Sequence, residues 1–233
     1  MYRSFPLFLT LTLISGCVND APSDTKDREY GVSPQLVEPD PGLIPTINPA
    51  KAVGWPEGIT PTPAAGLEVT AFARGLEHPR WLLVLPNGDV LVAESNAPAT
   101  EGAFGGIKGW IAEKMMAYAG AGVPSADRIT LLRDTNQDGV ADLKTAFLED
   151  LNSPFGMALV EDKLYVANAA SLLRFSYAEG MTSINAGGEL VTALPGKDLN
   201  HHWTKNVVAS KDGSALFVSV GSNSNIGENG MDR

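Results

Sequence analysis

Two adjacent histidines, His201 and His202, are the side chains best suited to acid–base chemistry. They are two of only three histidines in the chain. An imidazole can give or take a proton near neutral pH, which is what a general base must do. The pair precedes an apolar run at 207–209, and a loop rich in Gly, Ser and Asn follows at 221–230. Two interpretations stand: the pair acts as a base at the mouth of a strand, or it caps that strand by hydrogen-bonding the backbone.

A second set of candidate ligands lies between positions 134 and 142. Four oxygen-bearing side chains occur there: Asp134, Asn136, Asp138 and Asp142. They occupy positions 1, 3, 5 and 9 of a calcium-binding loop of the EF-hand type, with Gly139 at position 6. Position 12 is Thr145, so the usual bidentate glutamate is missing. Asp and Asn around a glycine also describe an ordinary turn. We predict calcium binding, with low affinity or with another closing ligand.

Short apolar runs must position these residues, and they occur in three similar pairs. In the first pair, Asn87-Gly88 separates two apolar runs, which is a strong hairpin signal. The other pairs span 157–168 and 207–221. Each pair follows a related lead-in, at 76–79, 151–154 and 199–202. An additional strand is expected after the first two pairs, at 128–133 and 171–175, and an alternating run at 67–72 also has the pattern of a strand.

Repeated antiparallel units with almost no helix predict an all-β fold, and a β-propeller in particular. The alternative is a β-sandwich with similar hairpins, but it does not explain the repeated lead-in. Residues 66–233 correspond to roughly three to four blades of ~40–50 residues each. A helical insertion is expected at about 98–126, because the apolar residues at 107, 110, 111, 115 and 118 share one face of a helix.

The first 16 residues predict an export signal. Arg3 precedes an apolar run that is too short to span the ~30 Å of a bilayer. The residues at 14–17 resemble a bacterial lipoprotein box, which predicts cleavage before Cys17 and a lipid on that cysteine; an ordinary secretory signal is the alternative. Cys17 is the only cysteine, so no disulfide can form within the chain. We therefore expect an exported, membrane-anchored protein of the periplasm or cell surface.

Residues 17–65 predict a tether between the lipid and the domain at 66–233. Prolines recur through the tether and prevent regular helix and strand pairing. The chain has 17 Lys and Arg against 27 Asp and Glu, a net charge of −10. This charge argues against nucleic acid as a partner and against electrostatic attraction to anionic lipid.

Four segments, 75–94, 127–142, 151–168 and 199–230, resemble the glucose/sorbosone dehydrogenase family, most closely its L-sorbosone dehydrogenase-like branch. The resemblance implies an exported six-bladed propeller that uses pyrroloquinoline quinone (PQQ) to oxidise a sugar or aldehyde and passes electrons to an acceptor. It implies that His202 is the general base, with His201 as the fallback. In such an enzyme the quinone supplies the redox chemistry, and the protein supplies position and electrostatics.

The sequence also departs from this family. Ser222 stands where sugar-oxidising relatives have an aspartate that orients the base, and Asn223 and Glu228 are candidates to replace it. The glutamine that glucose-oxidising members carry near the second blade is not evident at 151–156. In the family most quinone-binding groups lie beyond the position of Arg233, so we expect the N-terminal part of a longer protein, inactive alone. The quinone-binding residues and the substrate are left unassigned.

Two other functional classes stay open. One is a calcium-dependent lactonase-type propeller, which is a hydrolase. The other is a non-catalytic propeller that serves as a binding scaffold at the membrane.

Overall fold

A computed structural model describes residues 31–34, 49–98, 106–196 and 202–222 of the chain. The chain divides into two units, Met1–Asn48 and Pro49–Arg233, which are considered separately. In the first unit only 31–34 are described, and they form neither helix nor strand. The predicted export signal, Cys17, His201 and the loop after Ser222 lie outside the described residues. In the expected tether, residues 49–65 form no helix or strand.

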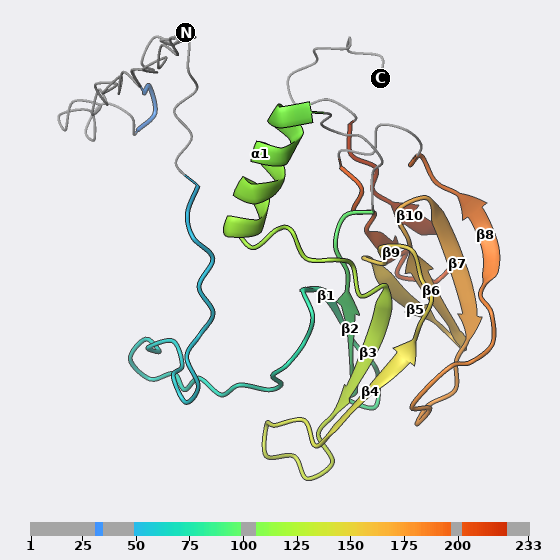
Figure 1. The fold of residues 1–233 in the computed structure, drawn as a ribbon. Helices are drawn as coiled ribbons and strands as arrows, with labels where there is room; N and C mark the ends of the chain where they lie inside the picture. Colours follow the sequence, from blue (N-terminus) through green and yellow to red (C-terminus); the bar gives the residue numbers. More distant parts are fainter. Residues whose placement is uncertain (1–30, 35–48, 99–105, 197–201, 223–233) are drawn as a thin grey trace, which may run out of the picture. The chain divides into compact units, whose positions relative to one another are not determined.

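The first sheet has four antiparallel strands in the order of the chain: β1 (Pro79–Val84), β2 (Val90–Glu94), β3 (Arg128–Arg133) and β4 (Leu143–Leu148). Figure 1 shows this simple up-and-down order. The predicted Asn87-Gly88 turn joins β1 to β2, and Gly88 has a φ of 88°, a left-handed conformation that favours glycine. Leu83 pairs with Leu91 and Val84 with Val90 across the hairpin.

The second sheet repeats the same plan. Its four antiparallel strands are β5 (Met157–Val160), β6 (Lys163–Ala167), β7 (Ser171–Ser176) and β8 (Glu189–Ala193). A third sheet begins with the pair β9 (Val207–Ala209) and β10 (Leu216–Val218). A four-stranded antiparallel meander is the form of a propeller blade. The all-β prediction is therefore confirmed, and the sheets are of the propeller-like kind. The described residues form two four-stranded sheets and one two-stranded sheet, and we call each of these sheets a blade.

The blades pack on one another through their faces. The larger core cluster joins the first two sheets, with fully buried Leu91 and Leu131 on one side and Leu164 and Val166 on the other. A smaller cluster joins the second sheet to the third through Leu172 and Val207. Burial of such side chains contributes roughly 1.5–3 kcal/mol each, so these two interfaces hold the sheets together.

Two buried carboxylates, one at each end of β2, form ion pairs with arginines at the ends of β3. Asp89, which precedes β2, accepts two hydrogen bonds of 2.7 Å from Arg133. Glu94, at the other end, is fully buried and pairs with Arg128 at 3.0 Å. Burial opposes the ionisation of Glu94, but hydrogen bonds from Arg128, from the Thr130 hydroxyl and from the Glu77 backbone N–H together hold its pKa below the usual value. The first sheet is therefore locked at both ends by ion pairs.

The expected helical insertion is present as α1 (Gly106–Tyr118). Its apolar side chains are not gathered on a buried face: Trp110, Ile111, Met116 and Tyr118 are all exposed. No helix in the described part of the chain has the length and apolar character needed to cross a bilayer. The strand expected at 67–72 is not formed; a backbone bond from Ala141 N–H to Phe72 O is what ties this segment to the first sheet.

Candidate functional site

The start of β1 and the segments that lead into β5 and β9 meet through one cation and three aromatic rings. We call Arg80, Trp81, Phe155 and Trp203 the entry cluster. The Trp81 and Phe155 ring centroids are 5.2 Å apart, and Phe155 meets Trp203 edge-on at 6.4 Å. Trp81 lies in β1, Phe155 precedes β5 and Trp203 precedes β9, so the cluster joins the starts of three successive blades.

Arg80 lies over two of these rings. Its Cζ atom is 5.3 Å from the Trp203 centroid and 5.9 Å from the Phe155 centroid, which is the range of cation–π attraction. Trp203 is buried, whereas Arg80 is exposed. The aromatic rings therefore hold an exposed guanidinium in place at the blade entries.

The backbones of the second and third blades approach closely beside this cluster. The Gly156 N–H donates to Lys205 O at 3.0 Å. A Cβ atom on Gly156 would lie 2.5 Å from Val207 N, closer than real contacts allow, so only glycine fits here. This close approach places the lead-in to β9, and with it His202, beside the entry of the second blade.

His202 is exposed, and its imidazole is fixed by a backbone group. Nδ1 is hydrogen-bonded to the carbonyl oxygen of Ser222. A carbonyl oxygen can only accept, so Nδ1 carries the proton and, in the neutral ring, Nε2 keeps its lone pair. This is the tautomer that a general base acting through Nε2 requires. Among the described residues, the group that orients this ring is the main-chain carbonyl of Ser222. The predicted candidates Asn223 and Glu228 lie outside the described residues.

Gly221 and Lys205 fix His202 from two sides. A Cβ on Gly221 would lie 2.4 Å from the His202 Cβ, so the absence of a side chain allows the ring to reach Ser222 O. Lys205 is almost wholly buried, and its Nζ donates to the His202 carbonyl at 2.9 Å. Burial lowers the pKa of this lysine. Lys205 thus acts on the backbone of His202.

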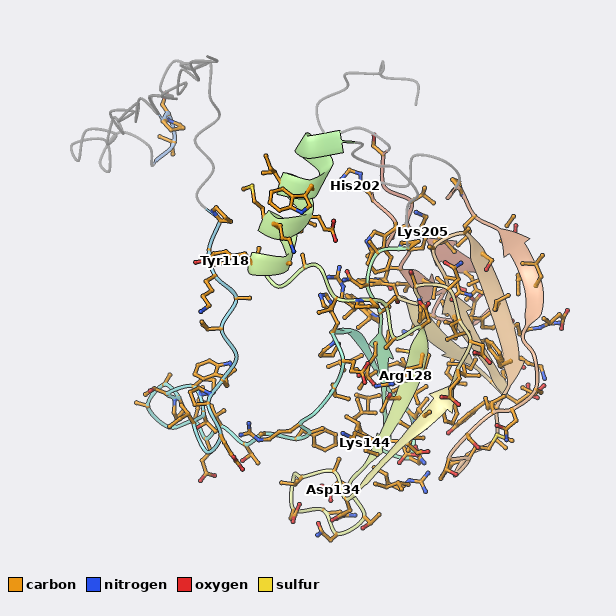
Figure 2. The ribbon with its side chains drawn as sticks, viewed as in Figure 1. Tyr118, Arg128, Asp134, Lys144, His202 and Lys205 are labelled. Carbon is orange, nitrogen blue, oxygen red and sulfur yellow. The ribbon has the colours of Figure 1, made fainter. Side chains whose placement is uncertain are left out.

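Figure 2 shows His202 and Lys205 near one end of the strands and Asp134 near the other. The predicted calcium ligands lie in the β3–β4 loop. Asp134 accepts the Gln137 and Gly139 backbone N–H groups at 2.7 and 2.8 Å. Asp142 accepts the hydroxyl and N–H of Thr135, which lower its pKa.

These bonds bring the loop's oxygens toward one another but also occupy several of them with backbone donors. Among the described residues, no three His, Cys, Asp or Glu side chains are grouped so that they could hold a metal ion. Calcium binding at 134–142 therefore stays a prediction.

His202 was predicted as a site residue from the sequence, whereas Arg80, Phe155 and Lys205 were not. The sequence does carry a signal for Arg80 and Phe155. Arg80 follows His78-Pro79 and Phe155 follows Ser153-Pro154, so both occupy the same place after the repeated lead-in, as Trp203 does after His202. Aligning the three lead-ins would have placed these side chains at equivalent points of neighbouring blades. Nothing in the sequence indicates that the Lys205 ammonium turns back to its own main chain.

Comparison with known proteins gives one family and one structural neighbour. The family model described as "Domain of unknown function (DUF7133)" matches residues 107–231, more than half of the chain. The fold is similar to an iodide structure of a Trichoderma reesei carbohydrate-active enzyme of family AA12, with 17% identity and a TM-score of 0.48. The match covers 69% of this chain and 34% of that chain, so this chain spans about a third of the neighbour's length. No curated protein matches the sequence.

Proposed function

Because the chain belongs to the family described as "Domain of unknown function (DUF7133)", which assigns no activity, we propose its function from its own residues. The protein is an exported quinoprotein that oxidises a sugar or a sorbosone-like aldehyde by hydride transfer to PQQ, with His202 as general base. The observation that carries the proposal is the fixed His202 ring, whose Nδ1 bond to Ser222 O leaves Nε2 to accept a proton. The sequence resemblance to the L-sorbosone dehydrogenase-like branch supplies the reaction class.

The entry cluster fits a quinone that carries carboxylates. Arg80 presents an exposed guanidinium held over Trp203 and Phe155. A guanidinium binds a carboxylate through two parallel N–H groups, so Arg80 is the described residue that would hold one carboxylate of PQQ. A PQQ held there would supply the hydride acceptor of the reaction.

The chain's own part in the reaction is removal of a proton. A carbon that bears a hydroxyl loses its hydride while a base removes the hydroxyl proton, so the base must reach that hydroxyl. An aldehyde substrate carries such a hydroxyl in its hydrated form. Nε2 of His202 takes this proton. The imidazolium that results donates Nδ1–H to the Ser222 carbonyl, whose dipole has its negative end toward the ring. Gly221 and Lys205 keep the ring in this position.

The test uses the full-length protein loaded with PQQ and Ca²⁺, with a dye as electron acceptor and glucose or sorbosone as substrate. His202→Gln should lower kcat by ~10²–10⁴-fold, the usual contribution of a positioned base. PQQ binding, measured by quinone absorbance, should change much less. The matched control is His78→Asn, because His78 precedes β1 as His202 precedes β9. His78 has a φ of 54°, which Asn tolerates.

The other functional classes give different results in the same assay. Hydrolysis of lactones with Ca²⁺ alone, without PQQ, would support a lactonase-type propeller. No absorbance change on adding PQQ and no turnover would support a binding scaffold. Normal turnover by the His202→Gln variant would show that the base is elsewhere.

A further inference from the structure

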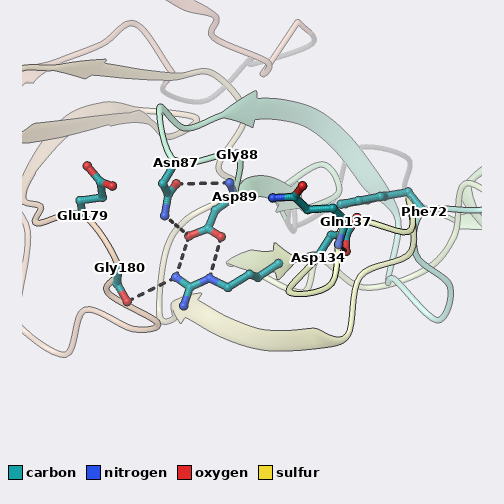
Figure 3. A pocket seen from close by; sticks show the side chains of 9 residues that line it. Phe72, Asn87, Gly88, Asp89, Asp134, Gln137, Glu179 and Gly180 are labelled. Atoms are coloured by element: carbon teal, nitrogen blue, oxygen red, sulfur yellow. Dashed lines mark hydrogen bonds and ion pairs between the residues drawn. The ribbon is translucent and has the colours of Figure 1, made fainter.

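A cavity of about 620 Å³ lies at the opposite end of the first blade from the entry cluster. It is bordered by the β1–β2 turn, the end of β3, the β3–β4 loop and the segment after β7, as Figure 3 shows. Seven side chains line it: Phe72, Asn87, Asp89, Arg133, Asp134, Gln137 and Glu179. Arg80 lies at the start of β1 and the cavity lies beyond the strand's other end, so the four steps of ~3.3 Å from Arg80 to Val84 separate them by about 13 Å. It is therefore a different place from the proposed active site.

The floor of this cavity is rigid. Asp89 is 2% exposed and accepts both 2.7 Å bonds from Arg133, and these bonds hold the Asp89 pKa below its usual value. Asn87 donates to the same carboxylate at 2.8 Å. Arg133 also donates to Gly180 O at 3.3 Å, which joins the first blade to the segment after β7. A guanidinium fixed in this way offers its remaining N–H groups without further ordering cost.

The rim supplies acceptors, donors and one apolar face. Glu179 provides a carboxylate on one side, and Gln137 provides an amide that both donates and accepts on the other (Figure 3). Phe72 adds a half-buried aromatic ring. Hydroxyl groups both donate and accept, and the C–H face of a sugar ring packs on an aromatic side chain. This mixture therefore matches a polyhydroxylated ligand.

Charge narrows the ligand further. Arg133 is neutralised by its ion pair with Asp89. The carboxylates of Asp134 and Glu179 then leave the lining acidic, which disfavours phosphates and sugar acids as ligands.

We propose that this cavity, which we call the turn-end cavity, is a binding site for a neutral saccharide. Its volume lies within the 300–1,000 Å³ of ordinary ligand pockets, enough for one or two sugar rings. The proposal does not depend on the dehydrogenase activity, because the site shares no residue with the entry cluster or His202.

The experiment measures binding of cellobiose to the full chain by isothermal titration calorimetry and saturation-transfer NMR, with glucosamine and glucuronate as charged probes. Cellobiose should bind, and glucuronate should not. The double variant Gln137→Gly/Glu179→Ala should weaken cellobiose binding about tenfold or more, since it removes polar groups from both sides of the cavity. Gln137 has a φ of 61°, which glycine adopts freely, and Glu179 is exposed, so the variant should fold.

Two matched variants separate this site from the proposed active site. Glu161→Gly removes a carboxylate from another left-handed turn, at φ 52°, and should leave binding unchanged. The His202→Gln variant should also bind cellobiose as the wild type does. Loss of turnover with retained cellobiose binding then distinguishes the two sites. The proposal is overturned if cellobiose does not bind, if only glucosamine binds, or if the double variant binds cellobiose as the wild type does.

Discussion

The position of His202 depends on the absence of a side chain at Gly221, so Gly221→Ala is a sharp perturbation. The new Cβ would lie 2.4 Å from the His202 Cβ and 3.1 Å from its Cγ. Carbon atoms pack at ≈ 3.5–4.0 Å, so the two segments must separate by about 1 Å. The conflict involves the first atom of the His202 side chain, which cannot turn away as the end of a long side chain would. The imidazole therefore loses its bond to the Ser222 carbonyl.

This displacement has two measurable consequences. Misplacing a catalytic group by about 1 Å costs on the order of 10²-fold in rate, so kcat of the PQQ-loaded protein should fall by this factor. Forcing a methyl group into a filled space costs roughly 1–3 kcal/mol, which should appear as a lower melting temperature. The control is Gly187→Ala, because a Cβ there meets nothing within 4 Å and should change neither property. Wild-type turnover and melting temperature in the Gly221→Ala variant would refute the described geometry.

Three further predictions concern other parts of the chain. The Glu94 pKa is depressed in the folded state, so its ion pair stabilises the protein above the unfolded-state value of about 4.3 and is lost as pH falls below it. Urea unfolding should show Glu94→Gln to be less stable at pH 7 by roughly 1–3 kcal/mol, with a difference that shrinks in acid; a constant difference would contradict the pairing. Calcium should raise the melting temperature of the wild type, and the Asp134→Ala/Asp138→Ala variant should lose that shift; an equal shift in both would place calcium elsewhere. Cys17→Ser should move the protein from the membrane fraction to the soluble fraction, because the lipid on that cysteine is the proposed anchor; unchanged fractionation would refute lipidation.

The hairpins were predictable because their signals are local. Asn87-Gly88 between two apolar runs fixes a turn, and the repeated apolar pairs give β5, β6, β9 and β10 close to their true limits. The outer strands β4 and β8 were not predicted. Every residue of β8 is exposed, and β4 interrupts its apolar residues with Lys and Thr. Outer strands form because a neighbouring strand offers hydrogen bonds, and that partner is not visible in a local pattern.

The candidate site was predictable only in its chemical type. His202 could be identified because imidazole is the natural base near neutral pH, but its orienting partner is a main-chain carbonyl, which any residue at position 222 would supply. Arg80 and Phe155 meet Trp203 only after three sheets have packed. Arg80 and Trp203 are more than 120 residues apart in the sequence. The run at 67–72 alternates like a strand, yet it forms none, because alternation does not provide a pairing partner.

The central claim is that the Ser222 carbonyl holds His202 with its proton on Nδ1 and a free lone pair on Nε2. Long-range ¹H–¹⁵N correlation spectra of the labelled imidazole distinguish the two neutral tautomers directly. In mildly alkaline buffer, where the ring is neutral, the account predicts a protonated Nδ1 and an unprotonated Nε2 for His202, and the loss of this preference in Gly221→Ala. A His202 ring with its proton on Nε2 in the wild type would contradict it.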